Sequence, residues 1–411
     1  MITPSRSVLL QSQLERSVLG MATNMLRTNI LKHGSMSSFL FVAFLYCLIP
    51  FEAGASNFAI VLRLGVATCL VLLVLLRFRP EITKTAAAYL GLLFVFSTMA
   101  ALRGLSGGVL ALACSAAFGV LIASAAIQST AFRETLRTSL LLLIAFSVLT
   151  LLLQVVVYIY NGSVLDIHQL LYPVSEARIY QNVGFMRLTG FYIEPGTYSN
   201  WLYMLLMIYV AISPGRSTQL VLVVAASMIF TLSAWGGGVA ALLIIVTALS
   251  SGKWRWAVLV FTVLVIVIIV VPADLIDGWF AVYEQKTDLD QISAGSKVET
   301  YAEFYRILDS VLVVGDGFKS SFCDFCLSPQ DAGLALNISV VLGLLFAVGM
   351  FGAYFFLLLR AGEFAFATLS IPFLFTKAFY WDFVVWLLFF LVVFGCPRVV
   401  RCRDSKSLRG R

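Results

Sequence analysis

The sequence predicts an all-α, polytopic membrane protein with about twelve transmembrane helices and two large outer loops. The first observation is composition: 61% of the 411 residues are hydrophobic, 12% are charged, and the mean hydropathy is +0.97. Soluble domains carry about 25% charged residues, so this composition excludes that class. The second observation is that apolar stretches recur along the chain, many of them near the roughly 17 to 25 residues that a bilayer core requires.

The apolar stretches give the expected helices in chain order, each bounded by charged or turn-forming residues. They lie near residues 36–51, 58–76, 86–102, 108–127, 138–160, 197–213, 218–234, 237–250, 256–272, 332–359, 363–377 and 380–396. We expect a single transmembrane domain over residues 36–396, with outer loops at about 161–196 and 273–331. A cytoplasmic segment, 1–35, precedes this domain, and a basic cytoplasmic tail, 397–411, follows it.

The basic residues give the orientation, because Lys and Arg are retained on the cytoplasmic side of short loops. Under the twelve-span arrangement most of them fall on one side, together with both termini. The two large loops then lie on the outer face of the membrane, which in a bacterium is periplasmic or extracellular. The formal net charge of +7 is explained by contact with the anionic lipid bilayer rather than by nucleic acid, which we do not expect as a partner.

The segment 187–196, RLTGFYIEPG, places charged and turn-forming residues between two apolar stretches. Pro195 suits the first turn of a helix, whose free N–H groups, with Arg187 nearby, would form a cradle for a diphosphate. The alternative is an interfacial loop whose charges face water. For Glu194, a general base and a structural residue that holds Arg187 or caps backbone donors both stay open.

The outer face also limits the chemistry, because no ATP is available there and a reaction must draw on an activated substrate. The sequence contains no phosphate-binding loop, no H-E-x-x-H metal site and no G-x-S-x-G nucleophile elbow. Asp288 and Asp290 form a D-x-D triplet that we interpret as a solvated loop, so we expect neither a metal nor a cofactor. Cys323 and Cys326 form a lone C-x-x-C that makes no zinc site but leaves a local disulfide open.

Four segments, taken in order, resemble the bacterial O-antigen polymerase and O-antigen ligase families of integral membrane glycosyltransferases. RLTGFYIEPGTYSNWL is similar to their R-x-x-G-x-x-x-E-P motif. The other three are TLSAWGGGVAALL (231–243), like their Ser- and Gly-rich helix entry; VLVVGDGFKSS (311–321), like their G-x-G-F stretch; and DAGLALNISVVLGLL (331–345), like the helix that follows. The resemblance extends from Arg187 to about Phe375.

The resemblance implies a GT-C-like membrane fold and a glycan transfer at the periplasmic face, without metal or cofactor. The donor would be an oligosaccharide on a polyprenyl diphosphate, and the acceptor a second lipid-linked repeat unit. Such a protein would also work beside a flippase and a chain-length regulator. Its tasks would be to bind two phosphates and to align a hydroxyl, and Arg187 suits the diphosphate because a guanidinium binds it in a bidentate manner.

The families carry a second basic residue, typically Arg, in the large loop. Lys297 stands at the matching place and Arg306 follows it, so either could bind the second phosphate, or both could be exposed charges of an amphipathic loop helix. Asp331 matches a position that is often acidic in polymerase-like members. It would orient the acceptor or, equally well, cap a helix.

A histidine distinguishes the two families, because ligases carry one, often as His-Asn, just before the helix that follows the large loop. This chain has Leu336-Asn337 there, and of its two histidines His33 is expected to be cytoplasmic and His168 a solvated loop residue. The sequence therefore favours a polymerase, with an O-antigen ligase as the alternative. A lipid-linked oligosaccharide flippase or transporter is less favoured, because its ionisable residues would lie at the membrane midplane.

Arg63 lies inside the second expected span, where a charge is costly unless it finds a partner or extends to the interface. It would either extend to the interface or contribute to binding the lipid diphosphate. Arg103, Lys377 and Asp382 could border the same groove.

Overall fold

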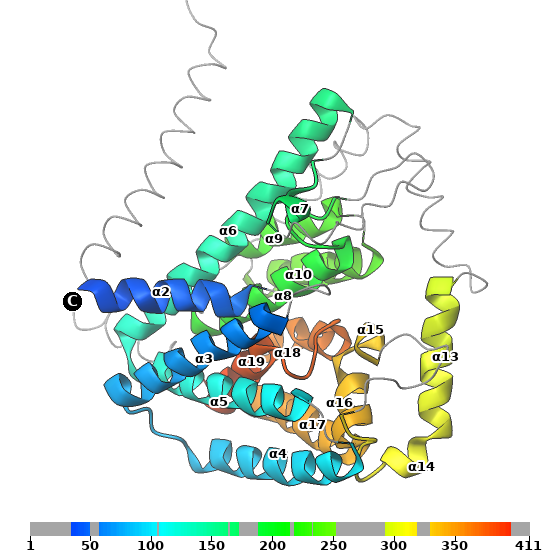
Figure 1. Cartoon of the computed structure of the whole chain (residues 1–411). Coiled ribbons are helices and arrows are strands. Elements are labelled where there is room, and N and C mark those ends of the chain that lie inside the picture. Colours follow the sequence, from blue (N-terminus) through cyan, green and yellow to red (C-terminus); the bar gives the residue numbers. More distant parts are fainter. Residues whose placement is uncertain are drawn as a thin grey trace, which may run out of the picture.

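The computed structural model describes residues 34–49, 57–104, 107–162, 165–171, 188–213, 218–231, 233–251, 292–318 and 329–395. Within these ranges the regular structure is helical, without a strand, as the sequence predicts (Figure 1). The helices are α2 (Gly34–Leu48), α3 (Asn57–Phe78), α4 (Lys84–Arg103), α5 (Gly107–Gln128), α6 (Thr130–Asn161), α7 (Ile167–Leu171), α8 (Pro195–Ile212), α9 (Thr218–Phe230), α10 (Ala234–Ser251), α13 (Ile292–Arg306), α14 (Leu308–Val311), α15 (Pro329–Ala332), α16 (Leu334–Leu342), α17 (Leu344–Arg360), α18 (Phe364–Leu369), the 3-10 helix η1 (Ile371–Phe375) and α19 (Phe383–Val393).

Four helices in the described residues are long and apolar enough to cross a membrane. They are Val61–Phe78, Lys84–Arg103, Gly107–Gln128 and Thr130–Asn161. Shorter apolar helices of 10–17 residues accompany them, so the fold is that of a membrane-embedded helical protein. The number of twelve spans stays a prediction, and the expected span at 256–272 lies outside the described residues.

Helix α19 forms the centre of the bundle. Its eleven residues, FVVWLLFFLVV, are all buried, as expected for a helix that is apolar on every side. It packs against α5 and α8. Gly119 allows α5 to pack closely against α19, because a Cβ at Gly119 would lie 2.6 Å from the backbone carbonyl carbon of Trp386 on α19.

The expected helix 332–359 is wrong as a continuous element, because the structure divides it into α15, α16 and α17. The breaks occur at Gly333 and Gly343, whose φ angles of 132° and 108° suit glycine. A Cβ on Gly343 would lie 2.5 Å from the carbonyl oxygen of Val313, so the loop before α15 occupies the place of a side chain. The Leu345 N–H donates across this break to Leu312 O at 3.0 Å.

The expected helix 363–377 is also interrupted, into α18 and η1. Beyond η1, residues 376–382 run without regular structure to α19. Pro372 lies inside η1, which is consistent with the end of α18 before it. This interruption matters because it places a polar segment at one end of the central helix.

We expect Gly119→Ala to destabilise the bundle by about 1–3 kcal/mol, because the added methyl group collides with the backbone of α19. Gly91→Ala on α4 is the matched control, since no atom lies within 4 Å of its added Cβ. Thermal unfolding of both variants in detergent measures the effect. Equal stability of the two variants would contradict the proposed close contact.

Candidate functional site at the start of helix α8

The loop that leads into α8 is held by Gln154, a fully buried side chain of α6. Its Oε1 accepts the backbone N–H groups of Thr189 at 3.0 Å and of Gly190 at 2.7 Å. Its Nε2 donates to the carbonyl oxygens of Gly190 and Leu165, both at 3.0 Å. One amide side chain therefore hydrogen-bonds to backbone N–H and C=O groups that have no helical partner in this loop.

His168 supports the same loop, and its prediction as a solvated residue is wrong. The side chain is only 1% exposed, and its Nδ1 lies 2.9 Å from the carbonyl oxygen of Phe191. Because a carbonyl only accepts, this ring nitrogen carries the proton. His168, on α7, is thus a structural residue that holds the loop before α8.

Helix α8 begins at Pro195, with Glu194 as its N-cap residue in an extended conformation. This confirms the predicted helix start. The carboxylate of Glu194 makes no capping hydrogen bond to the helix. It instead accepts from the Thr197 hydroxyl at 3.4 Å and contacts Lys377.

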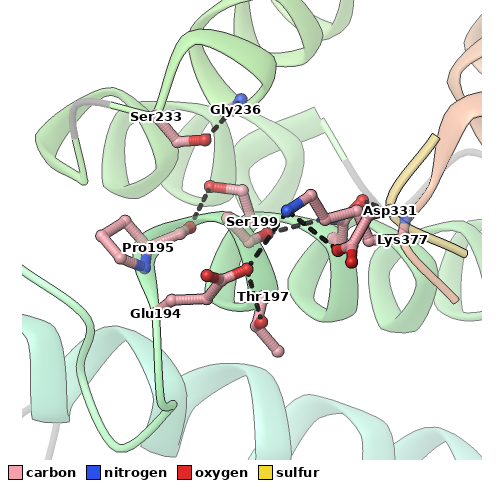
Figure 2. A network of polar contacts seen from close by, with 10 residues as sticks. Glu194, Pro195, Thr197, Ser199, Ser233, Gly236, Asp331 and Lys377 are labelled. Atoms are coloured by element: carbon pink, nitrogen blue, oxygen red, sulfur yellow. Dashed lines mark hydrogen bonds and ion pairs between the residues drawn. The ribbon is translucent and has the colours of Figure 1, made fainter. Parts of the chain in front are cut away.

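Lys377 joins two acidic residues that are far apart in the sequence, as Figure 2 shows. Its Nζ lies 3.4 Å from Glu194 Oε1 and 3.3 Å from Asp331 Oδ1. Its backbone N–H donates to Asn200 Oδ1 on α8 at 3.1 Å. We call Lys377, Glu194 and Asp331 the Lys377 cluster; it is partly exposed, with side-chain exposures of 29%, 20% and 30%.

The electrostatics of the cluster keep the lysine charged. Burial lowers the pKa of Lys377, but the charges of Glu194 and Asp331 and their hydrogen bonds outweigh it, so the pKa is raised above its ordinary value. The formal charges of the cluster are one positive and two negative. The cluster by itself therefore fixes two carboxylates in place and does not favour an anion.

The start of α10 lies beside the start of α8 (Figure 2). Ser199 on α8 lies 3.2 Å from the Thr231 hydroxyl and donates to Pro195 O at 3.1 Å. The N–H of Gly236 donates to Ser233 Oγ at 3.4 Å, and a Cβ at Gly236 would collide with the Ser199 hydroxyl. The small residues of the 231–243 segment thus let two helix starts, each a positive dipole end, lie together.

The other predicted site residues are placed as follows. Arg187 lies outside the described residues and directly precedes Leu188, where the described chain resumes. Lys297 belongs to α13, which packs against α15. Arg306 ends α13 with 78% side-chain exposure and pairs with Glu303 at 2.9 Å. The roles assigned to these residues stay predictions.

Arg63, on α3, is buried against α2 and α19. Its Nη2 donates to Cys47 O at 2.6 Å, and its guanidinium carbon lies 5.1 Å from the centre of the Phe383 ring. These contacts fix Arg63 within the bundle. Its expected role in diphosphate binding stays a prediction, and we do not include it in the site.

Arg103 and Asp382 also have structural contacts. Arg103 Nη1 donates to the carbonyl oxygens of Ser310 at 2.7 Å and Val314 at 3.0 Å. Asp382 accepts the backbone N–H of Phe379 at 2.8 Å. Asp288, Asp290, Cys323 and Cys326 lie outside the described residues.

The sequence identifies Glu194, Asp331 and Lys377 as separate candidates but does not predict that they meet. The supporting amides Gln154 and Asn200 are not predicted from the sequence either. The available signal was the position of these amides inside apolar stretches, where an unpaired amide is costly. The partners of these amides are backbone groups, which every residue carries, so the residue types do not reveal them.

We expect Gln154→Leu to cost about 1–3 kcal/mol, because two buried N–H groups would lose their acceptor. Gln169→Leu, on an exposed position of α7 close by, is the control. Thermal unfolding in detergent compares the two. A Gln154→Leu variant as stable as the control would mean that the loop is held by other contacts.

The raised pKa of Lys377 predicts a pH-dependent contribution to stability. The contribution of the charged lysine is complete below the ordinary lysine pKa of 10.5 and is lost as the pH rises through the raised value. The difference in melting temperature between wild type and Lys377→Met should therefore be constant from pH 8 to 10 and shrink above 10.5. A difference that is already gone at pH 9 would contradict the raised pKa.

Comparisons with known proteins give no match to a protein-family model, a curated protein or a solved structure.

Proposed function

We propose that the protein is a polysaccharide polymerase. It transfers a glycan chain from a polyprenyl-diphosphate carrier to a hydroxyl of a lipid-linked repeat unit at the periplasmic face of the inner membrane. The observation that carries this proposal is the Lys377 cluster. It joins Glu194, from the R-x-x-G-x-x-x-E-P segment, to Asp331, which opens the last of the four family-like segments. The 231–243 segment starts α10 beside them.

The diphosphate is assigned to the starts of α8 and α10. Both helices direct a positive dipole end toward this region, which favours an anion. Arg187, seven residues before Glu194, supplies the bidentate charge. The Gln154 contacts at residues 189 and 190 would hold the chain between Arg187 and Glu194 in one conformation.

The second basic group is assigned to Lys297 rather than to Arg306. Tyr301 donates from α13 to the carbonyl oxygen of Ala332, the residue after Asp331, at 2.8 Å. Position 297 stands four residues, about one helical turn, before Tyr301. Arg306, in contrast, is largely exposed and already paired with Glu303.

The reaction needs a base and no further energy source. The bond between the anomeric carbon and the phosphate oxygen breaks, and the diphosphate carries away the electron pair. The acceptor hydroxyl forms the new glycosidic bond and gives its proton to a carboxylate, for which Glu194 and Asp331 are the two candidates. Lys377 is a positioning residue, because it holds both carboxylates.

The test is reconstitution of the purified protein in liposomes with the polyprenyl-diphosphate repeat unit, without nucleotide or added metal. Separation of the products by length should give a ladder. A single transfer to added lipid A-core would instead assign a ligase. Absence of any transfer would refute the proposed function.

In this assay we expect Arg187→Ala to abolish the ladder and Arg187→Lys to keep part of it, because lysine retains the charge but loses the bidentate contact. Arg360→Ala is the control, since Arg360 is an exposed arginine at the end of α17. All variants must insert and unfold like wild type. A wild-type ladder from Arg187→Ala would remove Arg187 from the site.

A further inference from the structure

The segment 376–382 is an irregular stretch whose backbone is fixed by side chains of several helices. Asn200 on α8 accepts the N–H of residue 377, and Asn337 on α16 donates to the carbonyl oxygen of residue 378 at 3.5 Å. Trp386 on α19 donates to the carbonyl oxygen of residue 380 at 2.6 Å, and Ser115 on α5 donates to that of residue 381. Four helices thus hold one short segment rigidly.

The side chains of this segment alternate between inside and outside. Ala378, Tyr380 and Asp382 are buried, whereas Lys377, Phe379 and Trp381 are partly exposed. Residues 379–382 form a turn, in which the Asp382 N–H donates to the carbonyl oxygen of Phe379 at 3.0 Å. Lys377, the lysine of the charged cluster, and the two aromatic residues Phe379 and Trp381 are therefore the partly exposed members of this segment.

The two exposed rings are stacked on each other. The ring centroids of Phe379 and Trp381 are 4.6 Å apart, and their planes differ by 13°. The buried Tyr380 ring lies edge-on to Trp381, with the ring centroids 4.6 Å apart, and edge-on to Phe318 at 5.6 Å, so the pair is packed against further aromatic rings. The pair offers a flat aromatic surface, held in place and partly open.

We propose that Phe379 and Trp381 are a stacking platform for the acceptor sugar, whose hydroxyl groups bind the carboxylates of the Lys377 cluster. This inference rests on the proposed function and specifies how its acceptor is bound. A pyranose has an apolar face of C–H bonds that packs on an aromatic ring, and a rim of hydroxyls that donate to carboxylates. The aromatic pair and the partly exposed Glu194 and Asp331 supply both kinds of partner.

The charge of the site argues for a sugar rather than for the diphosphate. The Lys377 cluster has two formal negative charges and one positive, so it repels an anion and accepts hydrogen bonds from neutral hydroxyls. It also argues against lipid as the occupant of this face. Aromatic residues do anchor membrane proteins at the interface, but hydrocarbon beside three charged groups would desolvate them at a high cost.

The test measures binding and turnover separately. The binding probe is the free repeat-unit oligosaccharide, released from its carrier and therefore without phosphate. We expect Trp381→Leu and Phe379→Leu each to weaken its binding about tenfold, as for the loss of one stacked ring. Turnover should show a similar rise in KM for the lipid-linked acceptor, with a smaller change in kcat.

Two variants serve as controls. Trp381→Phe keeps an aromatic face and should bind nearly as wild type does. Phe364→Leu removes a 65% exposed ring of α18 that is not part of the stacked pair, and should leave binding unchanged. Folding is checked by thermal unfolding, and the backbone hydrogen bonds of residues 377–381 do not use the Trp381 side chain.

The outcomes separate the platform from the proposed function. A wild-type ladder together with unchanged affinity and KM in Trp381→Leu would overturn the platform and leave the polymerase proposal intact. Reduced membrane insertion with unchanged oligosaccharide affinity would assign the rings to lipid anchoring and also overturn it. Oligosaccharide binding that depends on Trp381, without any ladder from wild type, would support the platform and refute the polymerase.

Discussion

Backbone polar groups inside an apolar helical bundle need hydrogen-bond partners, and the arrangement of this protein depends on how that requirement is met. Residues 188–194, 312–318 and 376–382 of the described chain are irregular. Gln154 hydrogen-bonds to backbone groups of the first stretch, and Arg103 donates to the carbonyl groups of Val314 and Gly315 in the second. Asn200, Asn337, Ser115 and Trp386 satisfy the third. Each partner comes from a packed helix, so each irregular stretch is held in a defined position.

This constraint explains why chemistry can be concentrated at the start of α8. The N-cap residue of α8 meets a lysine and an acidic residue from two other segments. This is possible because the helices that carry those segments are interrupted beside the start of α8. The breaks at Gly333 and after η1 bring Asp331 and Lys377 to Glu194. The buried contacts fix the backbone, whereas the cluster itself is partly exposed. Ion pairs that are partly exposed in this way contribute only modestly to stability, so we propose that the cluster serves mainly a functional role.

The sequence predicts some of these features and not others, for physical reasons. Composition and periodicity identify the helices because an apolar face or an apolar run is a local property, and Pro195 marks the start of α8 by its missing donor. The interruption at Gly343 is not predictable in that way, since its cause is the carbonyl oxygen of Val313, thirty residues earlier. The burial of His168 likewise depends on the fold of a loop onto α6. The meeting of Glu194, Asp331 and Lys377 is a tertiary fact that no single segment encodes.

The two parts of the site make opposite electrostatic demands on a ligand. The starts of α8 and α10 favour negative charge, whereas the Lys377 cluster, with one excess formal negative charge, disfavours it. A molecule with an anionic end and a neutral, hydroxyl-rich end fits both parts of the site in only one orientation, with the anionic end at the helix starts. A sugar attached to a lipid diphosphate is such a molecule. These opposite preferences for charge, at the helix starts and at the Lys377 cluster, would therefore orient both substrates before the reaction begins.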